Sequence, residues 1–123
     1  MFDHVKFGVR DFAASKAFYL QALAPIGAVV VGEDEPSYGV EICDSGDVSL
    51  VLFETREQPA HLHIAFRAQT RAQVDAFHRA ALAAGAKDNG PPGLRPKYHA
   101  NYYAAFVIDP DGHNIELVCH AAA

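Results

Sequence analysis

The chain has 123 residues, half of them apolar and a fifth charged, with a formal net charge of −5 when histidine is neutral. This length suits one domain with its own core, and the composition excludes a disordered chain. The acidic balance argues against nucleic acid and anionic membranes as partners, and no apolar run approaches the roughly 20 residues of a membrane span. Without a visible secretory signal or a disulfide framework, we expect a cytoplasmic protein.

The first half predicts a strand, a helix and three more strands. Residues 5–9 alternate between apolar and polar side chains, as a half-buried strand does. Asp11 then stands where a helix N-cap belongs, and Pro25 and Gly27 end that helix. Three further strand-like runs follow, at residues 28–31, 38–42 and 48–53.

The second half predicts the same order of elements. A strand at residues 62–66 is followed by a helix over 71–84, which Thr70 caps and Gly85 stops. A strand near residues 86–89 is only weakly indicated, and residues 91–101 read as a loop rich in Pro and Gly. The last two strands, 102–108 and 114–119, are separated by a tight-turn sequence, Asp109-Pro110-Asp111-Gly112.

An internal repeat underlies this shared order. Shifting the sequence by 59 positions superimposes a set of matching residues, namely His4 on His63, Phe7 on Phe66, Phe18 on Phe77 and Leu23 on Leu82. We therefore predict a single α+β domain, residues 1–123, built from two βαβββ modules at about 1–57 and 58–123.

Strand alternation predicts where polar side chains gather. Glu116 lies between two apolar residues of the last strand, and a carboxylate buried there needs a partner or a metal. If the two modules pack symmetrically, His4 and His63 occupy equivalent positions and the last strand brings Glu116 towards them. Two imidazoles and one carboxylate suit a divalent transition metal.

Three segments of the chain resemble the vicinal oxygen chelate superfamily, which includes glyoxalase I, bleomycin-resistance proteins and extradiol dioxygenases. The opening segment, from Asp3-His4-Val5 to Phe18-Tyr19, is similar to the family's start. The strand beginning at His63 and the ending from Asp109 to Leu117 resemble its other two signatures. The resemblance covers essentially the whole chain and implies paired βαβββ modules whose sheets form a cup.

The resemblance also implies His4, His63 and Glu116 as ligands of a divalent metal, which could be Zn, Ni, Mn or Fe(II). Val51 stands where glyoxalase I has a fourth ligand, and the nearest carboxylate, Glu54, is expected on the opposite face. We therefore expect a metal-dependent enzyme for a small substrate with vicinal oxygens, of lyase, isomerase or dioxygenase type. The alternative is a non-catalytic protein of the bleomycin-resistance type that binds a small molecule.

The resemblance further implies a homodimer, in which His4 of one copy meets the other two ligands either in its own chain or across the dimer.

Three more residues are candidates for the site, each with a plainer alternative. Lys6 binds a substrate anion or extends into water, and His61 moves a proton or is a polar rim residue. Tyr102 binds a substrate oxygen or is a core aromatic. His99 and His120 are weaker candidates.

Overall fold

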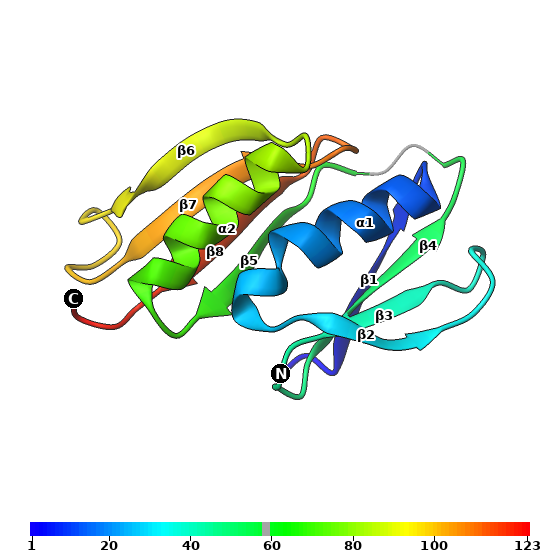
Figure 1. Cartoon of the computed structure of the whole chain (residues 1–123), viewed down its shortest axis with the longest axis horizontal. Coiled ribbons are helices and arrows are strands. Elements are labelled where there is room, and N and C mark those ends of the chain that lie inside the picture. Colours follow the sequence, from blue (N-terminus) through cyan, green and yellow to red (C-terminus); the bar gives the residue numbers. More distant parts are fainter. Residues whose placement is uncertain (58–59) are drawn as a thin grey trace.

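The computed structural model describes residues 1–57 and 60–123, so the predicted boundary between the two repeats falls beside two residues outside the described part. The first half forms one four-stranded sheet and one helix (Figure 1). Its strand order is β1-β4-β3-β2, with β1 parallel to β4 and the other pairs antiparallel. In chain order the elements are β1 (His4–Val9), α1 (Phe12–Ala22), the short 3-10 helix η1 (Ala24–Ile26), β2 (Val29–Glu33), β3 (Val40–Cys43) and β4 (Ser49–Glu54).

The second half repeats this topology strand for strand. Its order is β5-β8-β7-β6, again with the first strand parallel to the last one and the others antiparallel. The predicted α+β fold of two βαβββ modules is therefore confirmed. The elements are β5 (His63–Ala68), α2 (Arg71–Ala83), β6 (Lys87–Leu94), β7 (Tyr103–Ile108) and β8 (Asn114–Cys119).

Both helices begin at the caps that the sequence predicts. The side chain of Asp11 accepts a hydrogen bond from the backbone N–H of Ala14 at 3.0 Å. Thr70 and Gln73 form a full capping box, in which each side chain bonds the other residue's backbone N–H. These bonds satisfy N–H groups that a helix leaves without internal partners. The helices have 11 and 13 residues, and no helix in the described part of the chain is long and apolar enough to span a membrane.

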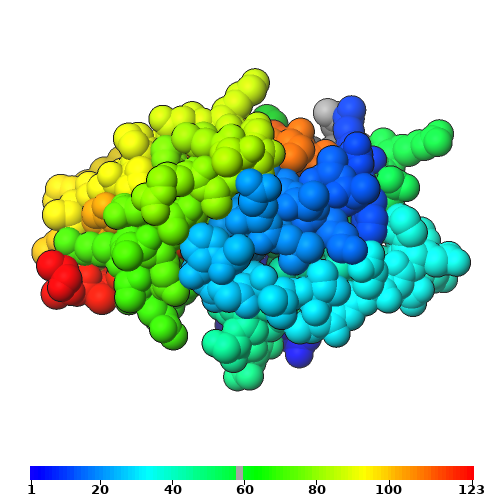
Figure 2. Space-filling model, viewed as in Figure 1, coloured from blue at the N-terminus to red at the C-terminus, as the bar shows by residue number. Residues whose placement is uncertain are grey.

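The two helices lie side by side on the same side of the two sheets (Figure 1). Figure 2 shows their side chains meeting along a continuous seam between the halves. Phe18 and Phe77, paired by the repeat, are both buried in one core that also takes in the helix-facing residues of β1, β4 and β8. The alternate residues of the strands therefore line a second, outer face of each sheet, where His4, Lys6 and His63 are exposed.

The turn between β7 and β8 joins the two modules as well as two strands. The buried carboxylate of Asp109 accepts hydrogen bonds from the backbone N–H groups of Asp111 and His113, at 2.9 and 2.8 Å. It also accepts one from the hydroxyl of Tyr19 on α1. The Ser15 hydroxyl of the same helix donates to Asp111 at 3.3 Å. The turn predicted from sequence is therefore held by the helix of the other module.

The prediction of a loop over residues 91–101 was wrong for its first part, because β6 continues to Leu94. Its pairing with β7 shifts register on both sides of Gly90, which has a φ of 155°. β6 is the outermost strand of its sheet, and prolines are tolerated there because one side of the strand needs no ladder hydrogen bonds.

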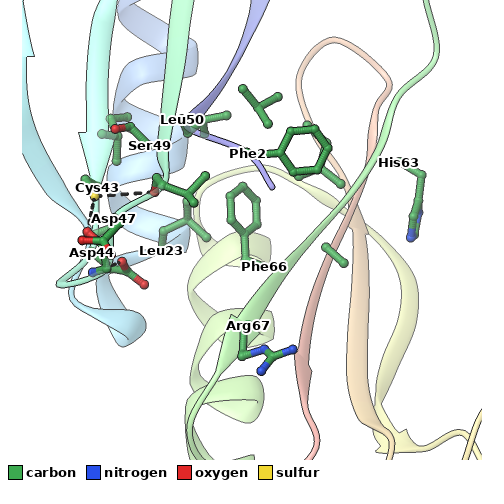
Figure 3. Close-up of a pocket in the computed structure, with 17 residues that line it drawn as sticks. Phe2, Leu23, Cys43, Asp44, Asp47, Ser49, Leu50, His63, Phe66 and Arg67 are labelled. Atoms are coloured by element: carbon green, nitrogen blue, oxygen red, sulfur yellow. Dashed lines mark hydrogen bonds between the residues drawn. The ribbon is translucent and has the colours of Figure 1, made fainter.

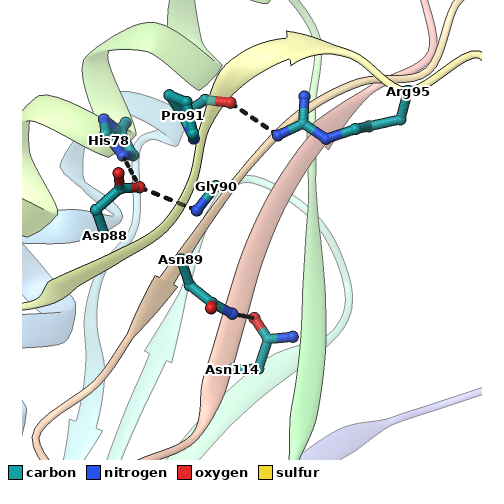
Figure 4. Close-up of polar contacts among 7 residues, drawn as sticks. All are labelled: His78, Asp88, Asn89, Gly90, Pro91, Arg95 and Asn114. Atoms are coloured by element: carbon teal, nitrogen blue, oxygen red, sulfur yellow. Dashed lines mark hydrogen bonds and ion pairs between the residues drawn. The ribbon is translucent and has the colours of Figure 1, made fainter.

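At the start of β6, Nε2 of His78 on α2 lies 2.9 Å from the Asp88 carboxylate (Figure 4). This hydrogen bond holds the pKa of the Asp88 carboxyl below its usual value.

Candidate functional site

The side chains of His63 and Glu116 meet on the outer face of the second sheet. β5 and β8 are parallel neighbours, and their register pairs Ala65 with Glu116. The Nε2 atom of His63 lies 2.9 Å from Oε1 of Glu116. Glu116 is only 2% exposed, whereas the His63 side chain is half exposed. The buried carboxylate thus has the partner that its position in the sequence demanded.

Tyr102, just before β7, holds the other oxygen of the same carboxylate. Its hydroxyl donates a hydrogen bond to Oε2 of Glu116. Burial and this hydrogen bond raise the pKa of Tyr102 to about 12, so the hydroxyl keeps its proton at neutral pH. The Tyr102 hydroxyl thus has a polar partner within the chain, and its binding of a substrate oxygen stays a prediction.

The donor atoms of His63 and Glu116 fit a divalent metal. Two ligands on neighbouring corners of a metal with bonds of about 2.1 Å are separated by about 3.0–3.4 Å. The imidazole nitrogen and the carboxylate oxygen are 2.9 Å apart, and a small movement together with loss of the shared proton would meet that spacing. Within the described part of the chain, however, no group of three such side chains comes together.

The third predicted ligand lies on the other sheet. His4 begins β1, where its Nδ1 lies 2.7 Å from the carboxylate of Asp3, and its side chain is half exposed. Lys6 follows on the same face, with its ammonium 5.2 Å from the centre of the Phe53 ring. β1 pairs with β4 in the first sheet, and among the described residues His4 does not join His63 and Glu116 in a group of three ligands.

The remaining predicted candidates fall into two places. His61 is exposed just before β5, beside Gly112 of the β7–β8 turn, and makes no hydrogen bond to another described side chain. His99 and His120 lie at the other end of the sheet, with Nε2 of His99 2.7 Å from Nδ1 of His120. Both of these rings pack edge-on against Tyr102, at 5.4 and 5.3 Å between ring centres.

Two residues of the outer face were missed as site residues in the sequence. Phe106 stands opposite Glu116 in the β7–β8 register, and its ring is stacked with that of His63 at 6.2 Å between centres. Arg95 places its guanidinium 5.3 Å from the centre of the Phe106 ring. Strand alternation could have placed Phe106, whereas Arg95 follows a strand whose bulges hide any alternation.

The outer face of the first sheet carries a carboxylate that was not predicted from the sequence. Val51 stands at the position of the fourth ligand of glyoxalase I, and Glu54 lies on the opposite, helix side as expected, where it accepts a hydrogen bond from the N–H of Phe12 at 3.5 Å. Glu41 of β3 stands directly opposite Val51, and its carboxylate accepts a hydrogen bond from the Ser49 hydroxyl at 2.5 Å. The outer face of the first sheet therefore carries an acidic group that only strand pairing reveals.

A cavity of about 700 Å³ lies between the two modules, next to their edge strands β1 and β5 (Figure 3). Its walls are mostly apolar and include the rings of Phe2 and Phe66. Asp44, Asp47 and Arg67 are its charged lining residues, and His63 also lines it. The cavity has the volume and the apolar character of a site for a small molecule.

The comparisons with known proteins agree on one family. The model of the Glyoxalase/Bleomycin resistance protein/Dioxygenase superfamily matches residues 1–117. No curated protein matches the chain.

Among solved structures, a glyoxalase/bleomycin resistance protein from Albidiferax ferrireducens T118 is 30% identical, with a TM-score of 0.83 over 98% of this chain and 99% of that one. A glyoxalase/bleomycin resistance protein/dioxygenase family enzyme from Burkholderia phytofirmans PsJN is 20% identical, with a TM-score of 0.75 over 97% and 98%. The oxidase ChaP-H2 is 21% identical, with a TM-score of 0.71 over 100% and 95%. The last two likenesses concern the fold alone.

Proposed function

Because the chain belongs to the Glyoxalase/Bleomycin resistance protein/Dioxygenase superfamily, we propose that it is a metal-dependent enzyme acting on a small substrate with vicinal oxygens. The observation that carries the proposal is the buried carboxylate of Glu116, bonded to His63 on one oxygen and to Tyr102 on the other. Such a group is costly to bury unless it is paired or coordinates a metal, and the exposed imidazole beside it can serve as a second ligand. One superfamily hosts many chemistries, so the argument rests on these side chains and not on the fold.

His63 and Glu116 would hold the metal together with His4 of a second copy, in a homodimer. Zn, Ni, Mn and Fe(II) all accept this combination of imidazole and carboxylate. When bound, the metal supplies a Lewis acid that polarises the oxygens of the substrate. The half-exposed side chain of His63 supports this assignment. Although Glu116 is buried, the imidazole beside it faces an open surface that a second copy and a substrate can reach.

The chain's own residues would bind and orient the substrate. Tyr102 keeps its proton and fixes the orientation of Glu116, and from the same place its hydroxyl is within reach of a substrate oxygen. Lys6 would supply a positive charge for a substrate anion, and His61 an imidazole that can move a proton. Val51 leaves no fourth carboxylate in its position, which favours chemistry with three protein ligands, either ring opening or an isomerase or lyase reaction.

The proposal is tested by the metal content of protein purified without added metal or chelator. We expect close to one metal per chain, measured by mass spectrometry, in the protein as purified or after reconstitution. His63→Ala and Glu116→Gln should each lower metal affinity at least tenfold, because each removes a direct ligand. Glu35→Gln, an exposed loop residue, is the matched control.

Two further measurements complete this test. Circular dichroism shows whether each variant is folded, so that loss of metal is read only from folded protein. The metal assignment is wrong if folded wild-type protein fails to bind metal even after reconstitution.

The second candidate is a small-molecule binding protein of the bleomycin-resistance type. The mostly apolar cavity of about 700 Å³ favours it, because a cavity of this kind can bind a ligand without any metal. Melting shifts caused by a panel of aromatic antibiotics in metal-free protein, without turnover, would favour this candidate. Both functions agree with a cytoplasmic location, where the free thiols of Cys43 and Cys119 stay reduced.

A further inference from the structure

Arg95 is a positive charge held in place without a negative partner. Its Nη2 donates to the carbonyl of Pro91 at 2.8 Å (Figure 4). Its Nη1 donates to the carbonyl of Gly93 at 2.9 Å. Within the described part of the chain, no carboxylate lies within ion-pair distance of its guanidinium. A guanidinium has five N–H donors, so three remain for another group.

The backbone of β6 leaves room for this side chain. A Cβ atom at Gly90 would come within 2.9 Å of the Phe106 ring and 3.2 Å of Nη2 of Arg95. A Cβ atom at Gly93 would come within 3.2 Å of Nη1. The same strand shifts register on both sides of Gly90, where the backbone has a positive φ that favours glycine. The two glycines and the bulges let the guanidinium lie flat along the strand.

The guanidinium is connected to the candidate metal ligands through the ring of Phe106. It packs on the ring of Phe106, at 5.3 Å from its centre, and the same ring is stacked with His63. Phe106 in turn stands opposite Glu116 in the strand pairing. A molecule bound at His63 and Glu116 could therefore extend across the edge of Phe106 to Arg95.

We propose that Arg95 binds a carboxylate of the substrate, so that the substrate class is a small carboxylic acid whose vicinal oxygens lie at His63 and Glu116. The position of those oxygens rests on the proposed function, whereas the carboxylate site rests on Arg95 alone. A planar guanidinium matches the two oxygens of a carboxylate, and binding one would neutralise an otherwise uncompensated charge. The nearby Glu116 carboxylate repels a dianionic phosphate more strongly than a singly charged carboxylate.

The test is an NMR titration of ¹⁵N-labelled protein from which metal has been removed by chelator and dialysis. The probes are acetate, its neutral counterpart acetamide, and inorganic phosphate. Acetate should give saturable shifts of the Gly90, Gly93 and Phe106 amides, and acetamide should not. Because metal is absent, this result is independent of metal content, which tests the proposed function separately.

Variants then assign the binding to Arg95. Arg95→Gln should weaken acetate binding at least tenfold, and Arg95→Lys should weaken it less, because it keeps the charge but loses the planar fork. Arg79→Gln, which removes the same charge from the exposed side of α2, should leave it unchanged. The proposal is overturned if acetate gives no saturable shift, if Arg95→Gln binds as the wild type does, or if only phosphate binds. Amide spectra of the variants show whether each one is folded.

Discussion

At the scale of single residues, the proposed site centres on one carboxylate. Glu116 is 2% exposed, and each of its oxygens has a partner, the imidazole of His63 and the hydroxyl of Tyr102. A charged group in so little water is retained only when neighbouring dipoles and charges replace its hydration. The consequence is measurable on Tyr102, because a neutral hydroxyl that donates to a carboxylate resists losing its proton.

The titration of Tyr102 is therefore a direct test of this contact. Its pKa is raised to about 12, above an ordinary value of 10.0, by burial and by the bond to Glu116. A raised folded-state pKa means that its contribution to stability is fully present below pH 10 and is lost as the pH rises through 12. We expect a ¹³Cζ NMR titration to find Tyr102 still largely protonated at a pH between the ordinary tyrosine value of 10.0 and 12.

The Glu116→Gln variant supplies the control for that titration. It removes the negative charge next to the hydroxyl, so the pKa of Tyr102 should fall towards the ordinary value of 10.0. An unchanged titration of Tyr102 in this variant would show that the carboxylate is not its partner in solution.

At the scale of elements, the two modules are joined by a helix and a turn from opposite halves of the chain. The hydroxyl of Tyr19 on α1 donates to Asp109 in the β7–β8 turn, and both side chains are buried. Burial is the main reason why the pKa of Tyr19 is raised well above its usual value, with the charge of Asp109 next. The contact fixes the end of β8 that carries Asn114 and Glu116 relative to the first module.

Removing the Tyr19 hydroxyl should therefore destabilise the whole chain. Tyr19→Phe keeps the ring but leaves one oxygen of a buried carboxylate without its donor, which costs roughly 1–3 kcal/mol. Urea unfolding should show a lower midpoint with an unchanged slope. Tyr38→Phe, at a tyrosine that is 66% exposed, should leave the midpoint within error. Equal midpoints for Tyr19→Phe and the wild type would contradict the importance of this contact.

At the scale of the whole molecule, the predicted ligands are divided between two sheets. His4 lies on the first sheet and His63 and Glu116 on the second, and one chain does not gather them into a group of three among its described residues. The repeat makes the two sheets similar in topology, so two copies related by a twofold axis can place the first sheet of one beside the second sheet of the other. A shared site of this kind requires a homodimer.

Mixing two inactive variants distinguishes a shared site from a site within one chain. His4→Ala and His63→Ala should each lose metal on their own. When the two are unfolded together and refolded, a mixed dimer contains one site in which His4, His63 and Glu116 are all intact and one site that lacks both histidines, so the mixture should regain metal that neither variant binds alone. No regain of metal in a mixture shown to contain mixed dimers would mean that the ligands come from a single chain.

Much of the fold was accessible from the sequence, because its signals are local. Alternation in the strands and the caps Asp11 and Thr70 depend on neighbours close along the chain, and the 59-residue repeat shows that the same local pattern occurs twice, so the βαβββ order follows from them. The exception is β6, an edge strand whose register shifts at Gly90 interrupt the alternation, so that its sequence pattern is that of a loop. The need of Glu116 for a partner was also visible, because a carboxylate inside an apolar strand is costly wherever it is placed.

The sequence by itself thus determined the two modules and the face of its strand on which each of His63 and Glu116 lies. It also determined that the Glu116 carboxylate needs a partner. Only the tertiary structure decided which side chains meet: Tyr102 and His63 on the two oxygens of Glu116, Arg95 on Phe106, and Tyr19 on Asp109. It also decided that His4 stands on a separate sheet. The physical reason is that periodicity depends on the local backbone, whereas strand register, bulges and packing between modules depend on contacts between residues far apart in the chain.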